Sequence, residues 1–467
     1  MNTQAVLRRK YILSDVIACS IAYLLYDGFR NAIEYDVPFT LFRSYLFTPK
    51  ALAVYFVFIV YWLAFFFLSG YYNKPVGRSR LVELSTSVLS IVFGSVPVFF
   101  VWVVDDILHN TGLYLPLYLY LVVIMLGVVY PLRIALTTWF IDRARRQGIR
   151  EKVLLITDHK ALDKARNALA NKRQEIVDII EISFEKTTEG REDILKEQLD
   201  RIGFAISLYN PDALVVSIEA ARAELVSLLL YKLYPFKLPV KVPIESLFFA
   251  GAKIKVASMV GEPMVDMTAT NMAEWEKNIK WLFDKLLSIL LLVLSSPLLL
   301  YLAIRVKLSS DGPVFFSQER IGLHGQPFMI YKFRTMFLGA EANGPQLSSD
   351  DDSRITKVGR TLRKYRLDEL PQFWNVLKGD MSFVGPRPER AYYIRQLIHH
   401  APYYYLLHNV RPGITSWGMV RYGYASNLEE MKERLKYDWL YYENMSLQLD
   451  LAVLVYTVRT LIKGSGK

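Results

Sequence analysis

The sequence predicts an α-helical membrane bundle joined to α/β structure: four N-terminal transmembrane helices, a Rossmann-like domain, and an α+β domain anchored by a re-entrant helix. Two observations support this prediction. Hydrophobic residues make up 52% of the 467 residues, and they gather in runs long enough to span a bilayer. Elsewhere, short apolar stretches alternate with polar segments, which is typical of buried strands between helices. We place the domains at 1–145, 146–272 and 273–467.

Four apolar runs open the chain, near 11–29, 51–70, 86–104 and 114–139. Each approaches the ~20 residues that a membrane-spanning helix needs. The first run is the weakest, because it contains Asp15 and Asp27. An aspartate in such a segment either pairs inside the bundle or lies at the membrane interface. We expect Asp15 at the interface.

Basic residues predict the orientation of these helices. Basic residues precede the first run, lie in the loop between the second and third runs, and follow the fourth run, whereas the loop with Asp105 and Asp106 has neither Lys nor Arg. The positive-inside rule then places the N-terminus and everything after Arg143 in the cytoplasm. The net charge of +11 indicates basic cytoplasmic loops and anionic substrates or headgroups, and we expect no nucleic-acid partner. The lone Cys19 excludes a disulfide framework or a cysteine-based metal cluster.

The segment 146–272 has the pattern of a Rossmann-like α/β domain. Four short apolar stretches, predicted as buried strands, lie at 153–157, 176–180, 213–217 and 238–242. The first of them is followed by Asp158–Ala161 rather than by a glycine-rich phosphate loop. Without such glycines a backbone cannot closely approach a pyrophosphate. We therefore expect a regulatory or oligomerising domain, in a homodimer, and not a dinucleotide site.

A fifth apolar run covers 279–306 and is long enough to span the membrane. Ser296 and Pro297 lie in its middle. Proline removes a helix hydrogen bond and restricts the residue before it, so the helix should bend sharply there. The run predicts a re-entrant helix that breaks at Ser296 and Pro297 and returns to the cytoplasmic face. The alternative is a fifth straight crossing.

Two short strands are predicted next, within 313–322 and 326–336, around a turn. Lys332 and Arg334 alternate with apolar neighbours in the second strand. Alternate residues of a strand share one face. This pair of cations is either a solvated strand face or an anion-binding one.

The stretch 354–390 is rich in Arg and Lys, yet it carries the adjacent acidic pair Asp368 and Glu369. One interpretation is a helix start, with Asp368 as the cap, Glu369 in the first turn and Pro371 close behind. The other is phosphate chemistry, because a carboxylate among cations can attack phosphorus or hold a divalent metal. The two are compatible, since a helix dipole and nearby cations keep a carboxylate ionised.

This stretch carries a family resemblance. Arg363, then Leu-Asp-Glu-Leu-Pro-Gln, then Trp-Asn-Val-Leu-Lys-Gly-Asp-Met-Ser, then Val-Gly-Pro-Arg-Pro resembles the bacterial polyprenyl-phosphate sugar-1-phosphate transferases. These monotopic phosphoglycosyl transferases begin capsule, exopolysaccharide and O-antigen synthesis. The resemblance covers the chain closely from Trp275 onward, and the earlier part is similar to the long form of the family in layout. Ser416–Val420 departs from the family pattern, which leaves the contacts of that segment open.

The resemblance implies transfer of a sugar 1-phosphate from a UDP-sugar to polyprenyl (undecaprenyl) phosphate, with release of UMP. It implies an α+β catalytic domain at the cytoplasmic face of the bacterial inner membrane, and a re-entrant helix in the bilayer. Asp368 would form a covalent phosphosugar intermediate, and Glu369 would hold Mg²⁺. The remaining residues that it assigns to substrate binding are Lys332, Arg334, Arg363, Pro386, Arg387 and Pro388.

Two alternatives keep the same layout. A catalytically silent membrane scaffold of a polysaccharide assembly complex would need no acidic pair. A transferase without a covalent step would use the two carboxylates only as metal ligands. The sequence does not identify the sugar.

Overall fold

The computed structural model describes residues 3–34, 48–73, 80–105, 113–146, 150–170, 174–182, 191–218, 229–230, 232–243, 264–268, 270–340, 344 and 352–462. The chain divides into two compact units, one of Met1–Ile149 with Ala273–Lys280 and one of Arg150–Met272 with Trp281–Lys467. The second unit contains parts of both predicted domains 146–272 and 273–467, and the boundary between these domains stays a prediction.

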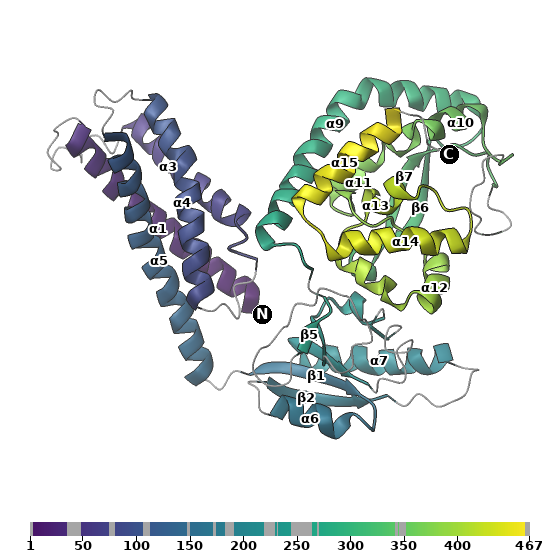
Figure 1. The fold of residues 1–467 in the computed structure, drawn as a ribbon, viewed down its shortest axis with the longest axis horizontal. Helices are drawn as coiled ribbons and strands as arrows, with labels where there is room; N and C mark the ends of the chain where they lie inside the picture. Colours follow the sequence, from purple (N-terminus) through teal and green to yellow (C-terminus); the bar gives the residue numbers. More distant parts are fainter. Residues whose placement is uncertain are drawn as a thin grey trace. The chain divides into compact units, whose positions relative to one another are not determined.

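The first unit is a bundle of apolar helices (Figure 1). Among the described residues, five helices are long and apolar enough to cross a membrane by length and composition: α1 (Thr3–Glu34), α3 (Pro49–Leu68), α4 (Arg80–Asp105), α5 (Tyr114–Arg146) and α9 (Glu274–Ser309). The first four belong to the first unit, whereas α9 belongs to the second unit from Trp281 onward. The prediction of apolar helices in these places is confirmed. Tyr and Trp side chains fill the bundle core, with Trp62 and Tyr26 almost fully buried.

Asp15 lies inside the bundle, and the expectation of an interfacial position is wrong. Its two carboxylate oxygens accept hydrogen bonds of 2.8 Å each from the Arg133 guanidinium, and both side chains are fully buried. Tyr72 donates a third hydrogen bond of 2.7 Å. Arg133 lies within the fourth apolar run, so the cation that Asp15 needs is supplied by α5. A buried charge with such a partner can remain inside an apolar bundle.

We expect Arg133→Leu to lower the free energy of unfolding of the bundle by about 3–5 kcal/mol, because Asp15 would stay buried without its cation. Asp15→Leu combined with Arg133→Leu removes both charges and should be less destabilising than the single change. Denaturation of the detergent-solubilised protein measures both variants. A double variant no more stable than Arg133→Leu would contradict this account of the ion pair.

The second unit contains a five-stranded sheet of order β2-β1-β3-β4-β5. β1 (Glu151–Thr157), β2 (Gln174–Glu181), β3 (Ala213–Ser217) and β4 (Val240–Pro243) run parallel, and β5 (Met264–Asp266) is antiparallel to β4. Val153 and Leu155 of β1 belong to the core with α6 (Leu162–Ala170), whereas Leu154 and Ile156 belong to the core with α7 (Arg191–Tyr209). The predicted α/β sheet is confirmed. β5 was missed, because three residues carry too short a pattern.

The long helix α9 is continuous through Ser296 and Pro297, so the predicted break of the helix there is wrong, and Figure 1 shows a bent helix in its place. Pro297 lacks the N–H that would bond the carbonyl of Val293, and the Ser296 hydroxyl donates to that carbonyl instead, at 2.8 Å. The Ser295 hydroxyl donates to the carbonyl of Leu291 at 2.6 Å. Only 11% of the most apolar window of α9 is buried, so its side chains are available to a lipid environment.

After α9, a β-hairpin and a set of short helices form the rest of the unit. β6 (Phe315–Ile321) and β7 (Pro327–Phe333) pair antiparallel around the 3₁₀ turn η5 (Leu323–Gly325). The strands that we predicted in this region are present, with shorter bounds. The later elements are α10 (Lys357–Lys364), η6 (Leu367–Glu369), α11 (Gln372–Lys378), β8 (Ser382–Val384), α12 (Ala391–His400), η7 (Pro402–Asn409), β9 (Gly413–Thr415), α13 (Trp417–Arg421), α14 (Leu428–Glu443) and α15 (Leu447–Ile462).

The sheet and the later elements share a core within this unit. The ring of Tyr234, in η3 (Tyr234–Phe236), lies 5.7 Å from the ring of Tyr405. The Asn409 amide donates 2.7 Å to the carbonyl of Met267. Such buried contacts tie the sheet to the part of the chain that carries the acidic pair.

Candidate active site

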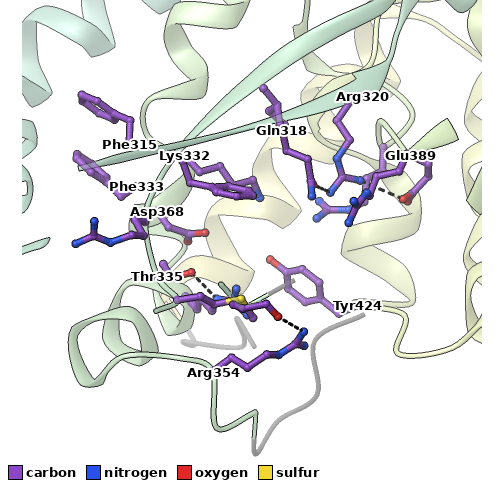
Figure 2. Close-up of a pocket in the computed structure, with 18 of the residues that line it drawn as sticks. Phe315, Gln318, Arg320, Lys332, Phe333, Thr335, Arg354, Asp368, Glu389 and Tyr424 are labelled. Carbon is purple, nitrogen blue, oxygen red and sulfur yellow. Dashed lines mark hydrogen bonds and ion pairs between the residues drawn. The ribbon is translucent and has the colours of Figure 1, made fainter. Parts of the chain in front are cut away.

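A cavity of about 460 Å³ lies over the β6–β7 hairpin, and Figure 2 shows side chains that line it. Directly opposed residues of an antiparallel pair point to the same face. The register pairs Phe316 with Lys332 and Gln318 with Ile330, and all four line the cavity. This face of the hairpin, with cations and apolar side chains mixed, forms a wall of the cavity, and the opposed pair Phe315 and Phe333 of the other face also lines the cavity.

The acidic pair lies beside this wall. Asp368 and Glu369 are buried in the short turn η6, and Asp368 lines the cavity. Lys332 donates a hydrogen bond of 2.6 Å to Glu369. The chain enters η6 through Arg366 in the left-handed conformation, with φ of 54°. The structure thus brings together Lys332, Asp368 and Glu369, which the sequence singled out from two distant segments.

The predicted helix cap at Asp368 is wrong. The following helix, α11, begins after Pro371 and has no side-chain hydrogen bond at its cap. Asp368 lies in the separate turn before it, and its carboxyl is free of a capping role there. Asn375 of α11 instead ties this helix to β7. Its side chain accepts a hydrogen bond of 3.1 Å from the Tyr331 N–H and donates one of 2.7 Å to the Met329 carbonyl.

The two carboxyl groups have opposite pKa shifts. Burial raises the pKa of Asp368 above its usual value, and the nearby Lys332 and Arg363 offset this only in part. Burial acts on Glu369 as well, but Lys332 and Arg387 outweigh it and lower the pKa of Glu369. Environments that separate two neighbouring carboxyl groups in this way are typical of sites that use them differently. Our expectation that a helix dipole and nearby cations would keep Asp368 ionised left out its burial, which raises its pKa.

Arg363 is held next to the end of β7. Its Nε donates 2.9 Å to the Thr335 hydroxyl, and it lines the cavity. Gly359 permits this packing of α10, because a Cβ atom there would lie 2.1 Å from the Thr335 carbonyl oxygen. Arg363 thus faces the same space as Asp368.

The Pro386–Arg387–Pro388 segment lies at another wall of the cavity. Arg387 lines it and has its guanidinium 5.4 Å from the ring of Tyr424. The Pro386 carbonyl accepts 2.9 Å from the Gly413 N–H, and the Pro388 carbonyl accepts 3.1 Å from Arg320. Backbone bonds therefore fix the segment, and the side chain of Arg387 is presented to the cavity.

Arg334 lines the cavity but is engaged with the backbone. Its guanidinium donates to the carbonyls of Val306 at 3.3 Å, Ser310 at 2.6 Å and Pro313 at 2.5 Å. These carbonyls lie at the end of α9 and in the loop after it. Arg334 therefore fastens that loop to β7, while its assignment to substrate binding stays a prediction.

Sequence reasoning missed a buried polar network at the far end of the cavity. Arg320 donates 2.7 Å to Gln318 and 3.4 Å to Glu389, and Arg434 also donates to Glu389. In Figure 2 this network lies on the opposite side of Lys332 from Phe315. One signal was available, because Glu389 directly follows Pro388.

A Mg²⁺ ion fits the acidic pair only in combination with a substrate. The described residues contain no group of three His, Cys, Asp or Glu side chains that would hold a metal unaided. Mg²⁺ is commonly bound by one or two carboxylates together with substrate phosphates. Asp368 and Glu369 offer two such carboxylates next to cationic side chains that suit phosphates, so the donor set is compatible with the ion.

Comparisons with known proteins match the part of the chain that carries this cavity. The family described as "Bacterial sugar transferase" matches residues 275–464. A UDP-N-acetylgalactosamine-undecaprenyl-phosphate N-acetylgalactosaminephosphotransferase of Aeromonas hydrophila is 45% identical over 188 residues, which are 40% of this chain and 44% of that protein. The UDP-glucose:undecaprenyl-phosphate glucose-1-phosphate transferase of Escherichia coli K12 is 39% identical over 206 residues, 44% of each chain. The match thus spans less than half the length of these two relatives.

The uncharacterized sugar transferase EpsL of Bacillus subtilis is 41% identical over 192 residues. These are 40% of this chain but 89% of that protein. The similarity to this shorter relative therefore covers nearly all of it.

Proposed function

Because this chain belongs to the bacterial sugar transferase family, we propose that it transfers a sugar 1-phosphate from a UDP-sugar to polyprenyl phosphate and releases UMP. The relatives' names give UDP-sugars and undecaprenyl phosphate as their substrates. The observation that carries the proposal is the buried Asp368 in a cavity that also presents Lys332 and Arg363. A catalytically silent scaffold would leave this buried carboxylate among cations unexplained.

Asp368 is the nucleophile in this proposal. A carboxylate oxygen attacks the sugar-linked phosphorus, and an O–P bond forms as the bond to the bridging oxygen breaks. UMP leaves with that electron pair. An oxygen of the polyprenyl phosphate then attacks the same phosphorus, and the carboxylate of Asp368 leaves. Dividing the reaction into two displacements replaces one difficult step by two easier ones.

The neighbouring side chains bind and orient the phosphates. Lys332, held by Glu369 at 2.6 Å, and Arg363, held by Thr335, place positive charge where the transition state gathers negative charge. Arg387, in Pro386–Arg387–Pro388, faces the uridine end. Glu369 would hold Mg²⁺, which would supply Lewis-acid stabilisation of the phosphate oxygens.

The site lies at the cytoplasmic face of the bacterial inner membrane in this proposal, where UDP-sugars are available. α9 is re-entrant, and the support for this is its bend and the Ser296 hydroxyl that bonds the carbonyl left free by Pro297. Where helix bonds are broken within lipid, other protein groups must replace them. A re-entrant α9 keeps Asp368 on the side of its donor and near the headgroup of its acceptor.

The sheet of the second unit is, in our proposal, a Rossmann-like regulatory or oligomerising element of a homodimer. Asp158, at the end of β1, accepts 2.8 Å from the Ala161 N–H, so a carboxylate stands where dinucleotide-binding folds place phosphate. Calorimetric titration with NADH checks for the expected lack of binding. The mass of the detergent-solubilised protein checks the dimer, and a monomer would contradict it.

The proposed function is tested by UMP release from purified membranes over a panel of UDP-sugars with undecaprenyl phosphate. Product formation with at least one sugar is expected. Membranes that release UMP from none of the sugars, with the protein present and folded, would contradict the transferase.

We also expect the rate to fall with decreasing pH. The midpoint of this fall should lie at a pH above the usual pKa of aspartate, about 3.9. The ionised Asp368 attacks, and burial raises its pKa, so protonation inactivates the site at a higher pH than for an exposed carboxyl. Lys332→Met should move this midpoint upward, because Lys332 lowers the pKa of Asp368. Glu369→Gln should move it downward, since the charge of Glu369 raises that pKa. The pH profile of kcat/KM measures both, and shifts of the same sign would contradict the assignment.

A further inference from the structure

We propose that one end of the cavity, which we call the apolar rim, binds the first isoprenoid units of the polyprenyl phosphate acceptor. The apolar rim consists of cavity-lining residues Pro313, Phe315, Phe316, Phe337 and Leu338. The inference rests on the proposed function and deepens it, because it gives the lipid chain a location on this protein.

The rim exposes large apolar side chains at the mouth of a charged site. Phe316 is 41% exposed, Phe337 51% and Leu338 64%. Contiguous exposed apolar surface of this kind marks a place where a ligand, a membrane or a partner binds. Because these side chains also line the cavity, the apolar surface continues into the space that holds Asp368.

The register of the hairpin places apolar and cationic groups side by side. Phe316 and Lys332 are directly opposed and share a face. Figure 2 shows Phe315 on one side of Lys332 and the Gln318, Arg320 and Glu389 network on the other. A ligand with an anionic group at Lys332 and a hydrocarbon chain toward Phe316 matches this arrangement. A polyprenyl phosphate has this combination of groups.

The rim is built on the end of the apolar helix α9. The Arg334 guanidinium fastens the carbonyls of Ser310 and Pro313 to β7. Leu338 packs over the same loop, because a Cβ atom on Gly312 would lie 3.0 Å from its side chain. Leu308, in the last turn of α9, is 80% exposed. Apolar surface therefore continues from the lipid-exposed side chains of α9 to the rim.

The opposite end of the cavity suits a different group. Tyr424 lies there with the guanidinium groups of Arg366 and Arg387 at 5.2 Å and 5.4 Å from its ring. The buried polar network of Arg320 and Glu389 also belongs to this end. Aromatic and polar groups together fit the nucleoside and sugar of the donor better than a hydrocarbon chain. The rim is then left for the acceptor.

The test is the double variant Phe337→Ser/Leu338→Ser in the full-length detergent-solubilised protein. We expect the KM for undecaprenyl phosphate to rise about tenfold, from the lost burial of two apolar side chains against the lipid. The KM for geranyl phosphate, a soluble short-chain acceptor, should rise by a similar factor. The KM for the UDP-sugar should change less than about twofold. The matched control is Leu451→Ser/Val455→Ser, two exposed residues of α15 outside the cavity lining, which should leave all three values unchanged.

Three results would overturn the inference. A rise confined to undecaprenyl phosphate would make the rim a membrane contact only. A rise in the KM for the UDP-sugar would make it a stacking surface for the base. Unchanged KM values for both acceptors would show that the rim binds neither. A wild-type protein that transfers sugar phosphate from no UDP-sugar would overturn the proposed function itself, before any variant is made.

A second measurement does not depend on the folding of the serine variant. p-Benzoylphenylalanine placed at position 338 should cross-link to radiolabelled undecaprenyl phosphate, and excess geranyl phosphate should suppress the adduct. An adduct that geranyl phosphate does not suppress, or no adduct in an active protein, would contradict a specific acceptor site.

Discussion

Asp368→Asn is expected to lower UMP release by more than about a thousand-fold while the protein still folds. Loss of a nucleophile removes the reaction path itself and not only a binding contact. Asparagine keeps the shape of the side chain but carries no charge and cannot form an acyl phosphate. The side chain is buried in η6, so a change of similar size leaves the packing largely intact.

Two measurements detect the covalent step separately from overall turnover. In the absence of acceptor, labelled UMP should exchange into the UDP-sugar with the wild type and not with Asp368→Asn. Label from the sugar phosphate should stay on the wild-type protein after denaturation. The matched control is Asp212→Asn, since Asp212 bonds the Lys152 N–H at 3.0 Å and lies outside the cavity lining. It should remain within about twofold of the wild type.

Retention of more than a few percent of turnover in Asp368→Asn would remove the nucleophile from the proposal. The transferase without a covalent step would then be favoured, with both carboxylates as metal ligands. Such an outcome would leave the assignment of the chain to the sugar transferase family unchanged and would alter only the proposed mechanism.

Pro297→Leu combined with Ser296→Leu is expected to convert part of the protein to a straight, membrane-spanning α9. Proline inside a helix costs about 3 kcal/mol or more unless the bend is used, and Ser296 bonds the carbonyl that the proline leaves free. Leucine at position 297 restores the backbone N–H, and leucine at both positions lengthens the uninterrupted apolar run. Chains that cross the membrane here would place Asp368 outside the cytoplasm and be inactive.

Single cysteines report this topology in intact cells, in a Cys19→Ala background. Lys436→Cys lies after α9 and Arg150→Cys before it, so only the first changes side when α9 straightens. A membrane-impermeant thiol reagent should label neither position in the otherwise wild-type protein, and only position 436 in the straightened variant. Labelling of position 436 without the leucine changes would refute the re-entrant helix. Labelling of position 150 would refute the predicted orientation of the bundle.

Local patterns in the sequence were sufficient to predict most of the helices and strands, but not β5 and not the residues that contact one another between elements. The strands at 153–157 and 213–217 could be predicted because an apolar run is recognised from its own residues alone. The predicted position of Asp15 was wrong because its partner, Arg133, is 118 residues away along the sequence. A sequence does not state such a pairing, and an aspartate in an apolar run is equally consistent with a membrane interface.

In the candidate site, too, the residue types could be predicted from the sequence but several of their contacts could not. The cations and the acidic pair were found from composition and resemblance, and the structure places Lys332 against Glu369. The cap at Asp368 failed because Arg366 adopts a left-handed conformation that makes a separate turn before α11. The contacts of Arg334 with three carbonyls were not foreseeable. They depend on where the end of α9 lies, which no local pattern specifies.

The β6–β7 hairpin also fixes the distance between the two ends of the cavity. Phe316 and Arg320 stand on the same face of β6, four residues apart, and a strand advances about 3.3 Å per residue, so the two ends of the site are separated by about 13 Å. Substitutions can change which group binds at each end but not this spacing. A one-residue insertion would turn the cavity-facing side chains to the other face. The length of the site can therefore change only in steps of two residues, about 6.6 Å, made in both strands at once.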